Sequence, residues 1–130
     1  SRPNECRPMN RTTRRQAAER RGHRAEQHAA LLLRLKGFRV LARRYRCRVG
    51  EIDIVARRAR LLVAVEVKAR ADFDAAAHAI DRRQRTRIIR ATDHFLAANP
   101  SYSDYQIRFD AILVAPGKLP RHIPDAWRIE

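Results

Sequence analysis

Residues 51–68 have the sequence EIDIVARRARLLVAVEVK, in which two apolar runs are separated by a short segment of mainly positive charge. The first run, 51–56, alternates acidic and apolar residues at its start, and the second, 61–68, is apolar over most of its length. Runs of this length and composition are typical of strands, and the charged segment Arg57–Arg60 between them is typical of a turn. The sequence therefore predicts a β-hairpin.

The register of this hairpin determines which side chains meet. If Ala56 lies opposite Leu61, then Asp53 lies opposite Ala64 and diagonal to Glu66 on the same face. Diagonal neighbours have Cα atoms about 7–8 Å apart, so both carboxylates would reach one ion, and the small Ala64 would leave space for it. A slip of one residue would instead place the two acids on opposite faces of the sheet.

Acidic side chains are unusual on otherwise apolar strands, and this hairpin carries three of them, at Glu51, Asp53 and Glu66. Neighbouring carboxylates in a half-buried site repel one another unless a proton or a cation neutralises them. We therefore expect Asp53 and Glu66 to bind Mg²⁺ or Mn²⁺, with the backbone carbonyl of Val67 as a third oxygen ligand. Lys68 would then position a water nucleophile or stabilise the charge of a phosphate transition state.

A simpler interpretation of the same residues is a salt bridge between the strands on a solvated face, which contributes about 0–1 kcal/mol. Glu51 also fits a surface acid that pairs with Arg48. Side-chain direction separates the interpretations, because Asp53 and Glu66 on opposite faces of the sheet would rule out a shared metal.

The rest of the chain supplies helices and further strands around the hairpin. Periodic apolar residues and breakers predict two helices, over 16–36 and 74–98, and strands over 38–48 and 106–115, with a last short strand over 126–129. Gly37 stands where a helix C-cap belongs, and the many charges of 38–48 indicate a strand near an edge. The expected order is α-β-β-β-α-β-(β), an α/β (α+β) fold with a mixed sheet flanked by helices.

Two polar residues of the predicted helices fall on apolar stripes. Glu26 lies three residues before Ala29, and Gln84 lies four residues from both Ile80 and Ile88. These spacings turn both side chains towards the core, so both are candidate site residues. The alternatives are an arginine partner for Glu26 and a hydrogen-bonded core amide for Gln84.

The composition is strongly basic, since 29 Lys and Arg residues against 14 Asp and Glu give a formal net charge of +15. Such a charge favours polyanionic partners, and 45% hydrophobic residues indicate a folded domain rather than a disordered tail. We expect a disordered basic arm over residues 1–15, a single domain over 16–130, and nucleic acid, DNA in the first place, as the partner.

The apolar runs are too short to span a membrane. No hydrophobic signal core follows the basic N-terminus, which predicts a cytoplasmic location.

Several enzyme classes lack their motifs in this sequence. There is no CxxC pair and no HExxH, which argues against a structural zinc site. There is also no glycine-rich phosphate loop and no nucleophile elbow around a serine. Acid-and-metal chemistry, or binding without catalysis, remains.

The pattern of Asp53 followed by Glu66-Val67-Lys68, D-x12-ExK on a hairpin, resembles the PD-(D/E)XK nucleases of the restriction-endonuclease-like superfamily. More specific segments resemble the YraN family of bacterial proteins, and together they extend over roughly residues 22–114. They are AEQHAA at 25–30, ARRYRCRVGEIDIVAR at 42–57, VAVEVKAR at 63–70, RRQRTRI at 82–88 and RFDAILV at 108–114. One departure from that family is Arg83, at a position where its members often carry Lys.

This resemblance implies a nuclease-like fold related to Holliday-junction resolvases, with Glu26 beside the metal and Gln84 near the phosphate or an active-site water. We accordingly expect a metal-dependent endonuclease that hydrolyses phosphodiester bonds in DNA, above all in structured or branched DNA. One alternative is a module of the same fold that binds nucleic acid without cleaving it, and a weaker one is a ribosome- or RNA-associated basic protein. A resolvase acts with two active sites on one junction, so that role would require a homodimer.

Overall fold

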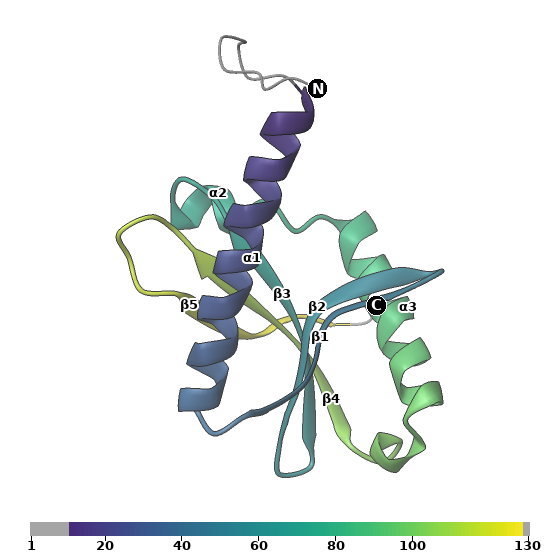
Figure 1. Ribbon diagram of the computed structural model, residues 1–130. Coiled ribbons are helices and arrows are strands. Elements are labelled where there is room, and N and C mark those ends of the chain that lie inside the picture. The colour runs from purple at the N-terminus through teal and green to yellow at the C-terminus, as the bar shows by residue number, and fades with distance from the viewer. Residues whose placement is uncertain (1–10, 129–130) are drawn as a thin grey trace, which may run out of the picture.

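The computed structural model describes the backbone of residues 11–128 and the side chains of residues 22–128. The predicted fold class is confirmed, since a five-stranded mixed sheet is flanked by helices on both faces (Figure 1). In chain order the elements are α1 (Arg11–Leu35), β1 (Arg39–Cys47), β2 (Gly50–Arg58), β3 (Leu61–Ala69), α2 (Phe73–Ala77), α3 (Arg82–Ala98), the 3-10 turn η1 (Pro100–Tyr102), β4 (Gln106–Val114) and β5 (Arg121–Trp127). Among these residues no helix has both the length and the apolar composition needed to cross a membrane.

The sheet has the strand order β1-β2-β3-β4-β5, so β1 lies at an edge as its charges predicted. Neighbouring strands are antiparallel except β3 and β4, which are parallel and are joined through α2 and α3. A parallel pair needs a crossover of this length, because the chain must return to the starting edge of the sheet. The helices α1 and α3 lie on opposite faces (Figure 1).

Strand β3 separates the two hydrophobic cores by simple alternation. Val63 and Val65 pack under α1 with Leu33, whereas Leu62 and Ala64 pack under α3. The predicted assignment of alternate β3 residues to opposite faces is confirmed, and Glu66 therefore belongs to the α3 face. The apolar face of β3 is covered by α1.

Strand β2 does not alternate regularly near its start. Ile52 packs in the core under α3 and Ile54 packs in the core under α1, although residues two apart normally share a face. The strand changes direction between them, at Asp53, and the loop end of the β1–β2 hairpin lies beside α3 (Figure 1). Gly50 permits this close approach, because a Cβ built there would lie only 2.0 Å from the carbonyl oxygen of Arg87.

The helix boundaries differ in part from the prediction. The C-terminus of α1 is confirmed: Gly37 has a φ of 90°, and the amide of Phe38 donates to the carbonyl of Leu33 in a Schellman arrangement. The N-terminus lies at Arg11 rather than near Gln16, so part of the predicted arm is helical. The rest of that arm, residues 1–10, lies outside the described residues, and its disorder stays a prediction.

The single helix predicted over 74–98 is wrong, because the segment forms α2 and α3 with a break between them. The carboxylate of Asp81 accepts a hydrogen bond from the amide of Gln84 and caps α3. An acid followed three residues later by Gln is a helix-start signal, and here it outweighs the apolar period. The last strand, β5, also begins earlier than predicted, at Arg121, with an irregular register that accommodates Pro124 at the sheet edge.

Candidate functional site

The hairpin register differs from the predicted one by two residues. Arg58 pairs with Leu61 across a tight turn, and the regular pairing continues to Ile54 and Val65. Asp53 therefore lies level with Glu66 rather than diagonal to it. The predicted pairing of Asp53 with Ala64 is wrong, because the turn is shorter than the charges suggested. A shift of two residues, unlike a shift of one, leaves the alternation of faces unchanged.

The regular main-chain pairing of β2 and β3 ends at Asp53, whose side chain replaces a main-chain hydrogen bond. The amide of Val67 donates a hydrogen bond to Asp53 Oδ2 at 2.8 Å, so a carboxylate takes the position of a main-chain acceptor. The N–H and C=O of one strand residue point towards the same neighbouring strand. The carbonyl of Val67 therefore also faces β2, where the regular pairing has ended, on the same side as the Asp53 carboxylate.

Glu66 is almost completely buried, with 3% of its surface exposed. Lys68 Nζ lies 3.0 Å from Glu66 Oε2, and the side-chain amide of Gln84 donates to the same oxygen from α3. Burial, and after it the nearby Asp53 carboxylate, raise the pKa of Glu66 to about 8 against the opposing effect of Lys68. The structure thus brings four of the predicted site residues together: Asp53, Glu66, Lys68 and Gln84.

Glu26 approaches the same place from α1, on the other side of Asp53. It is 5% exposed, and its oxygens lie 3.3 Å from Arg43 Nη2 and 3.4 Å from Arg44 Nε. Burial raises the pKa of Glu26, Asp53 adds to the rise, and the two arginines lower it. Glu26 and Asp53 both line a cavity of about 120 Å³. Glu26 therefore has the arginine partners that the sequence analysis left open as an alternative. The sequence did not identify Arg43 and Arg44 as these partners.

The oxygen donors of this site suit a small divalent cation that keeps some of its waters, rather than a metal held entirely by protein side chains. Within residues 22–128 no group of three or more His, Cys, Asp or Glu side chains is arranged to hold a metal. Magnesium, however, is commonly held by one or two carboxylates and keeps several waters. Asp53, Glu66 and the Val67 carbonyl supply hard oxygen donors of this kind. The raised pKa of Glu66 reflects first its burial and then the negative charge of Asp53, and a cation would neutralise that charge.

Glu51 lies at the exposed edge of this cluster and lines the same small cavity as Glu26 and Asp53. It is exposed, and Oε1 lies 3.7 Å from Arg87 Nη2 on α3 rather than beside Arg48.

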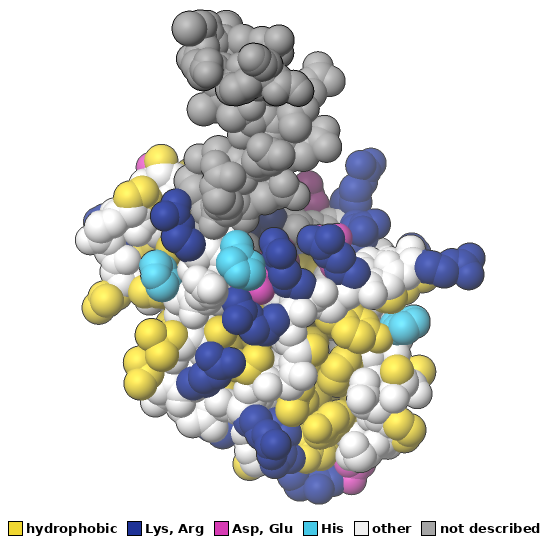
Figure 2. Space-filling view, viewed as in Figure 1, with side chains coloured by type: hydrophobic (Ala, Val, Ile, Leu, Met, Phe, Trp, Pro, Cys, Tyr) yellow, Lys and Arg dark blue, Asp and Glu magenta, His cyan; other side chains and the backbone are white. Residues whose placement is uncertain are grey.

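The surface around the site is basic. Figure 2 shows the side of the molecule that carries α1, where dark blue Lys and Arg side chains are far more numerous than magenta Asp and Glu. A cavity of about 850 Å³ lies beside α1 and includes Val67 and Lys68 in its wall.

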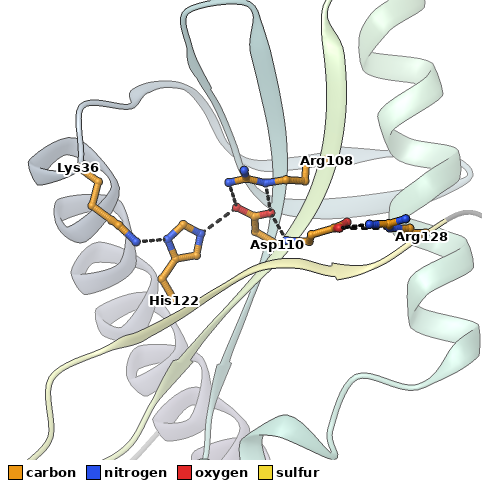
Figure 3. Close-up of polar contacts among 6 residues, drawn as sticks. Lys36, Arg108, Asp110, His122 and Arg128 are labelled. Carbon is orange, nitrogen blue, oxygen red and sulfur yellow. Dashed lines mark hydrogen bonds and ion pairs between the residues drawn. The ribbon is translucent and has the colours of Figure 1, made fainter.

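A third buried acid, Asp110 on β4, was not predicted from the sequence. It is fully buried and accepts hydrogen bonds from Arg108 Nε and Nη2 at 2.8 and 2.9 Å and from the amide of Asp125 at 2.9 Å. His122 Nε2 lies 2.8 Å away, and Lys36 continues the network to the surface (Figure 3). The signal was an acid inside the apolar run of residues 107–115.

Comparison with known proteins identifies the family. The model of uncharacterised protein family UPF0102 matches residues 25–114. A UPF0102 protein of Parvibaculum lavamentivorans is 54% identical over 112 residues, which cover 86% of this chain and 84% of that protein. Another, from Methylorubrum extorquens, is 50% identical over 123 residues and covers 95% of this chain and 96% of its own length. The chain belongs to the UPF0102 family.

Proposed function

We propose that this protein is a metal-dependent nuclease of the PD-(D/E)XK type that hydrolyses phosphodiester bonds in DNA. One observation carries the proposal: Asp53, next to the last regular pair of β2 and β3, accepts from the Val67 amide beside the buried Glu66, and Lys68 Nζ lies 3.0 Å from Glu66. A carboxylate pair with an adjacent ammonium group, on the hairpin that carries D-x12-ExK, is the arrangement that the sequence resemblance implied.

Each residue has a distinct role in this proposal. Asp53, Glu66 and the Val67 carbonyl would hold Mg²⁺ or Mn²⁺, which supplies Lewis-acid polarisation of the phosphate and lowers the pKa of water. Lys68 donates hydrogen bonds to the attacking water or to the phosphate oxygen that gains charge. Gln84 fixes the Glu66 carboxylate through its amide. Glu26, held by Arg43 and Arg44, adds negative charge beside Asp53.

The substrate class follows from charge. A net charge of +15 and the basic surface around the site favour a polyanion, and phosphates contribute most of the affinity in such complexes. The resemblance to the YraN family and to resolvases favours DNA, with branched or otherwise structured DNA as the first candidate.

The experiment is a cleavage assay with supercoiled, single-stranded and four-way-junction DNA in Mg²⁺, Mn²⁺ and EDTA. The wild type is expected to cut at least one of these DNAs with a divalent ion and none in EDTA. Asp53→Asn and Glu66→Gln should abolish cleavage, whereas the matched control Asp93→Asn, an exposed acid of α3, should retain it. Cleavage that survives Asp53→Asn would contradict the proposal.

The second candidate is a module that binds DNA and cleaves nothing. The net charge favours it as much as it favours the nuclease, but clustered acids facing a polyanion weaken binding and serve no purpose in a pure binder. Binding of DNA by the wild type, with no cleavage of any substrate and no change in Lys68→Ala, would favour the binding module.

A further inference from the structure

A groove lies between the middle of α1 and the C-terminal ends of the parallel strands β3 and β4. Its volume is about 850 Å³, a size that holds a ligand of nucleotide dimensions. One wall is formed by α1 from Gly22 to His28, and the other by residues 67–71 and 114–118. The C-terminal ends of parallel strands are where open sheets commonly place ligand sites.

The wall of the groove is basic. Arg24, Lys68, Arg70 and Lys118 line it together with His28. Among the described residues that form the wall there is no Asp or Glu. Four cations around a cavity of this size concentrate positive potential inside it, which selects a ligand with more than one negative charge.

The groove is continuous with the candidate site. Gly22 and Val67 line both the groove and the small cavity that contains Asp53 and Glu26. Lys68, whose ammonium group contacts Glu66, belongs to the groove wall as well. A chain that passes through the candidate site therefore has a path into the groove.

The remaining wall residues are small. They are Gly22, Ala25, Val67, Ala69, Ala71, Val114, Ala115, Pro116 and Gly117, and the described part of the wall contains no Phe, Tyr or Trp. Base stacking, the usual source of base contacts in single-strand binding, is therefore limited here to His28 and the arginine guanidinium planes. Binding would depend on phosphates, and it would tolerate any sequence.

We propose that this groove holds a single-stranded segment of DNA that continues from the phosphodiester at Asp53 and Glu66. The inference rests on the proposed nuclease function and names its substrate class: DNA with a single-stranded tail or flap next to the cleaved bond. A duplex is far bulkier than the space of about 850 Å³ in this groove, so it could lie across the groove but not inside it. One strand, separated from its complement, fits between α1 and the strand ends.

The test measures DNA binding in EDTA by fluorescence anisotropy, so that it does not depend on cleavage. The probes are a single strand, a blunt duplex, and the same duplex with a single-stranded DNA or RNA tail. The groove variant is Arg24→Glu with Lys118→Glu. Its matched control is Arg34→Glu with Arg90→Glu, two exposed arginines outside the groove that give the same change in net charge. Thermal unfolding of both variants verifies that each is folded.

The wild type is expected to bind the tailed duplex more tightly than the blunt one. The groove variant should lose at least about tenfold more affinity for the DNA tail than the control does, and the two variants should bind the blunt duplex equally. Each lost phosphate contact to a single strand lowers the salt slope by about 0.7, so the slope should fall by about 1.4. Photo-crosslinks from 4-thiothymidine in the tail should lie in residues 67–71 or 114–118.

Other outcomes overturn the inference. Equal losses in the groove variant and the control would reduce the groove to part of a general basic surface, and tighter binding of the RNA tail would exclude DNA as its ligand. Crosslinks confined to α3 would place the strand on the opposite face of the sheet. Tail binding through the groove, together with no cleavage under any condition, would overturn the nuclease function and leave the groove as a binding site.

Discussion

Two buried carboxylates on neighbouring strands of the same sheet have opposite chemistry. Glu66 on β3 faces α3 and Asp110 on β4 faces α1, and their exposed fractions are 3% and 0%. Burial alone raises the pKa of any carboxyl group, because it removes water from the charged form. The pKa of Glu66 rises to about 8, yet that of Asp110 falls to about 2.

The difference lies in the hydrogen-bond donors around each acid. Burial of Asp110 is outweighed by hydrogen bonds from His122 and Arg108 and from the Asp125 amide, which keep it charged (Figure 3). Glu66 has one lysine and one amide, and it faces a second carboxylate. A buried acid with a full set of donors stabilises the fold, whereas one left with excess negative charge is suited to a cation.

The largest expected effect is the loss of Asp110. Asp110→Ala removes one partner of a buried ion pair and leaves Arg108 without its carboxylate, which costs about 3–5 kcal/mol of the free energy of unfolding. Equilibrium urea unfolding of the variant and the wild type measures this. A loss below about 1 kcal/mol would show that the network is not structural and would remove the contrast with Glu66.

The next effect concerns catalysis rather than stability. Lys68→Ala should lower the single-turnover cleavage rate by about 10²–10³, because one well-placed donor to developing charge is worth that much. DNA affinity should change little, since the salt slope depends on all phosphate contacts and one contributes only about 0.9. Arg90→Ala is the control for loss of one positive charge. Equal cleavage by Lys68→Ala and the wild type would remove Lys68 from the proposed mechanism.

Local sequence patterns were sufficient to predict most of the fold. Alternation in β3 and the breaker at Gly37 depend only on neighbouring residues, and both predictions are confirmed. The turn between β2 and β3 was placed too wide, because Arg57 and Arg58 are charged yet continue the strand. Arg57 is half-buried and donates to the hydroxyl of Tyr105, a partner far away in sequence. Such long-range partners are invisible to a local pattern.

The sequence predicted which residues belong to the candidate site better than it predicted how they are arranged. Gln84 was expected near the acids from its place on an apolar stripe, and it contacts Glu66. The turn of β2 at Asp53 was not predictable, because it depends on how the β1–β2 hairpin packs against α3 at Gly50. Asp110 was missed since a single acid in an apolar strand does not reveal its donors.

The pH dependence of stability tests the donor set of Asp110. Its pKa is about 2 in the folded protein and 3.8 for the ordinary group, so its stabilisation is fully present above pH 3.8 and is lost as the pH falls towards 2. The contribution is about 2 kcal/mol for a shift of this size. Urea unfolding from pH 6 to pH 2 should show the difference between wild type and Asp110→Asn shrinking over that window. A constant difference would contradict the lowered pKa.

The smallest effect has the opposite sign and concerns the repulsion between the site acids. Asp53→Asn keeps an oxygen that accepts from the Val67 amide and leaves the Glu66–Lys68 pair intact, but it removes one negative charge from beside Glu66. In EDTA at pH 8 or above, the variant should be more stable than the wild type by about 1 kcal/mol, the equivalent of roughly one pKa unit.

The sign follows from the raised pKa of Glu66. Its proton favours the folded state below the ordinary pKa of 4.5, and that contribution is lost as the pH rises through about 8, where the two charges repel each other. The advantage of Asp53→Asn should therefore disappear near pH 5, where Glu66 keeps its proton. Added Mg²⁺ should raise the Tm of the wild type by mass action and leave that of the variant unchanged. Thermal unfolding with and without Mg²⁺ at both pH values measures these effects, and a variant less stable than the wild type at pH 8 in EDTA would mean that Asp53 is structural, as Asp110 is.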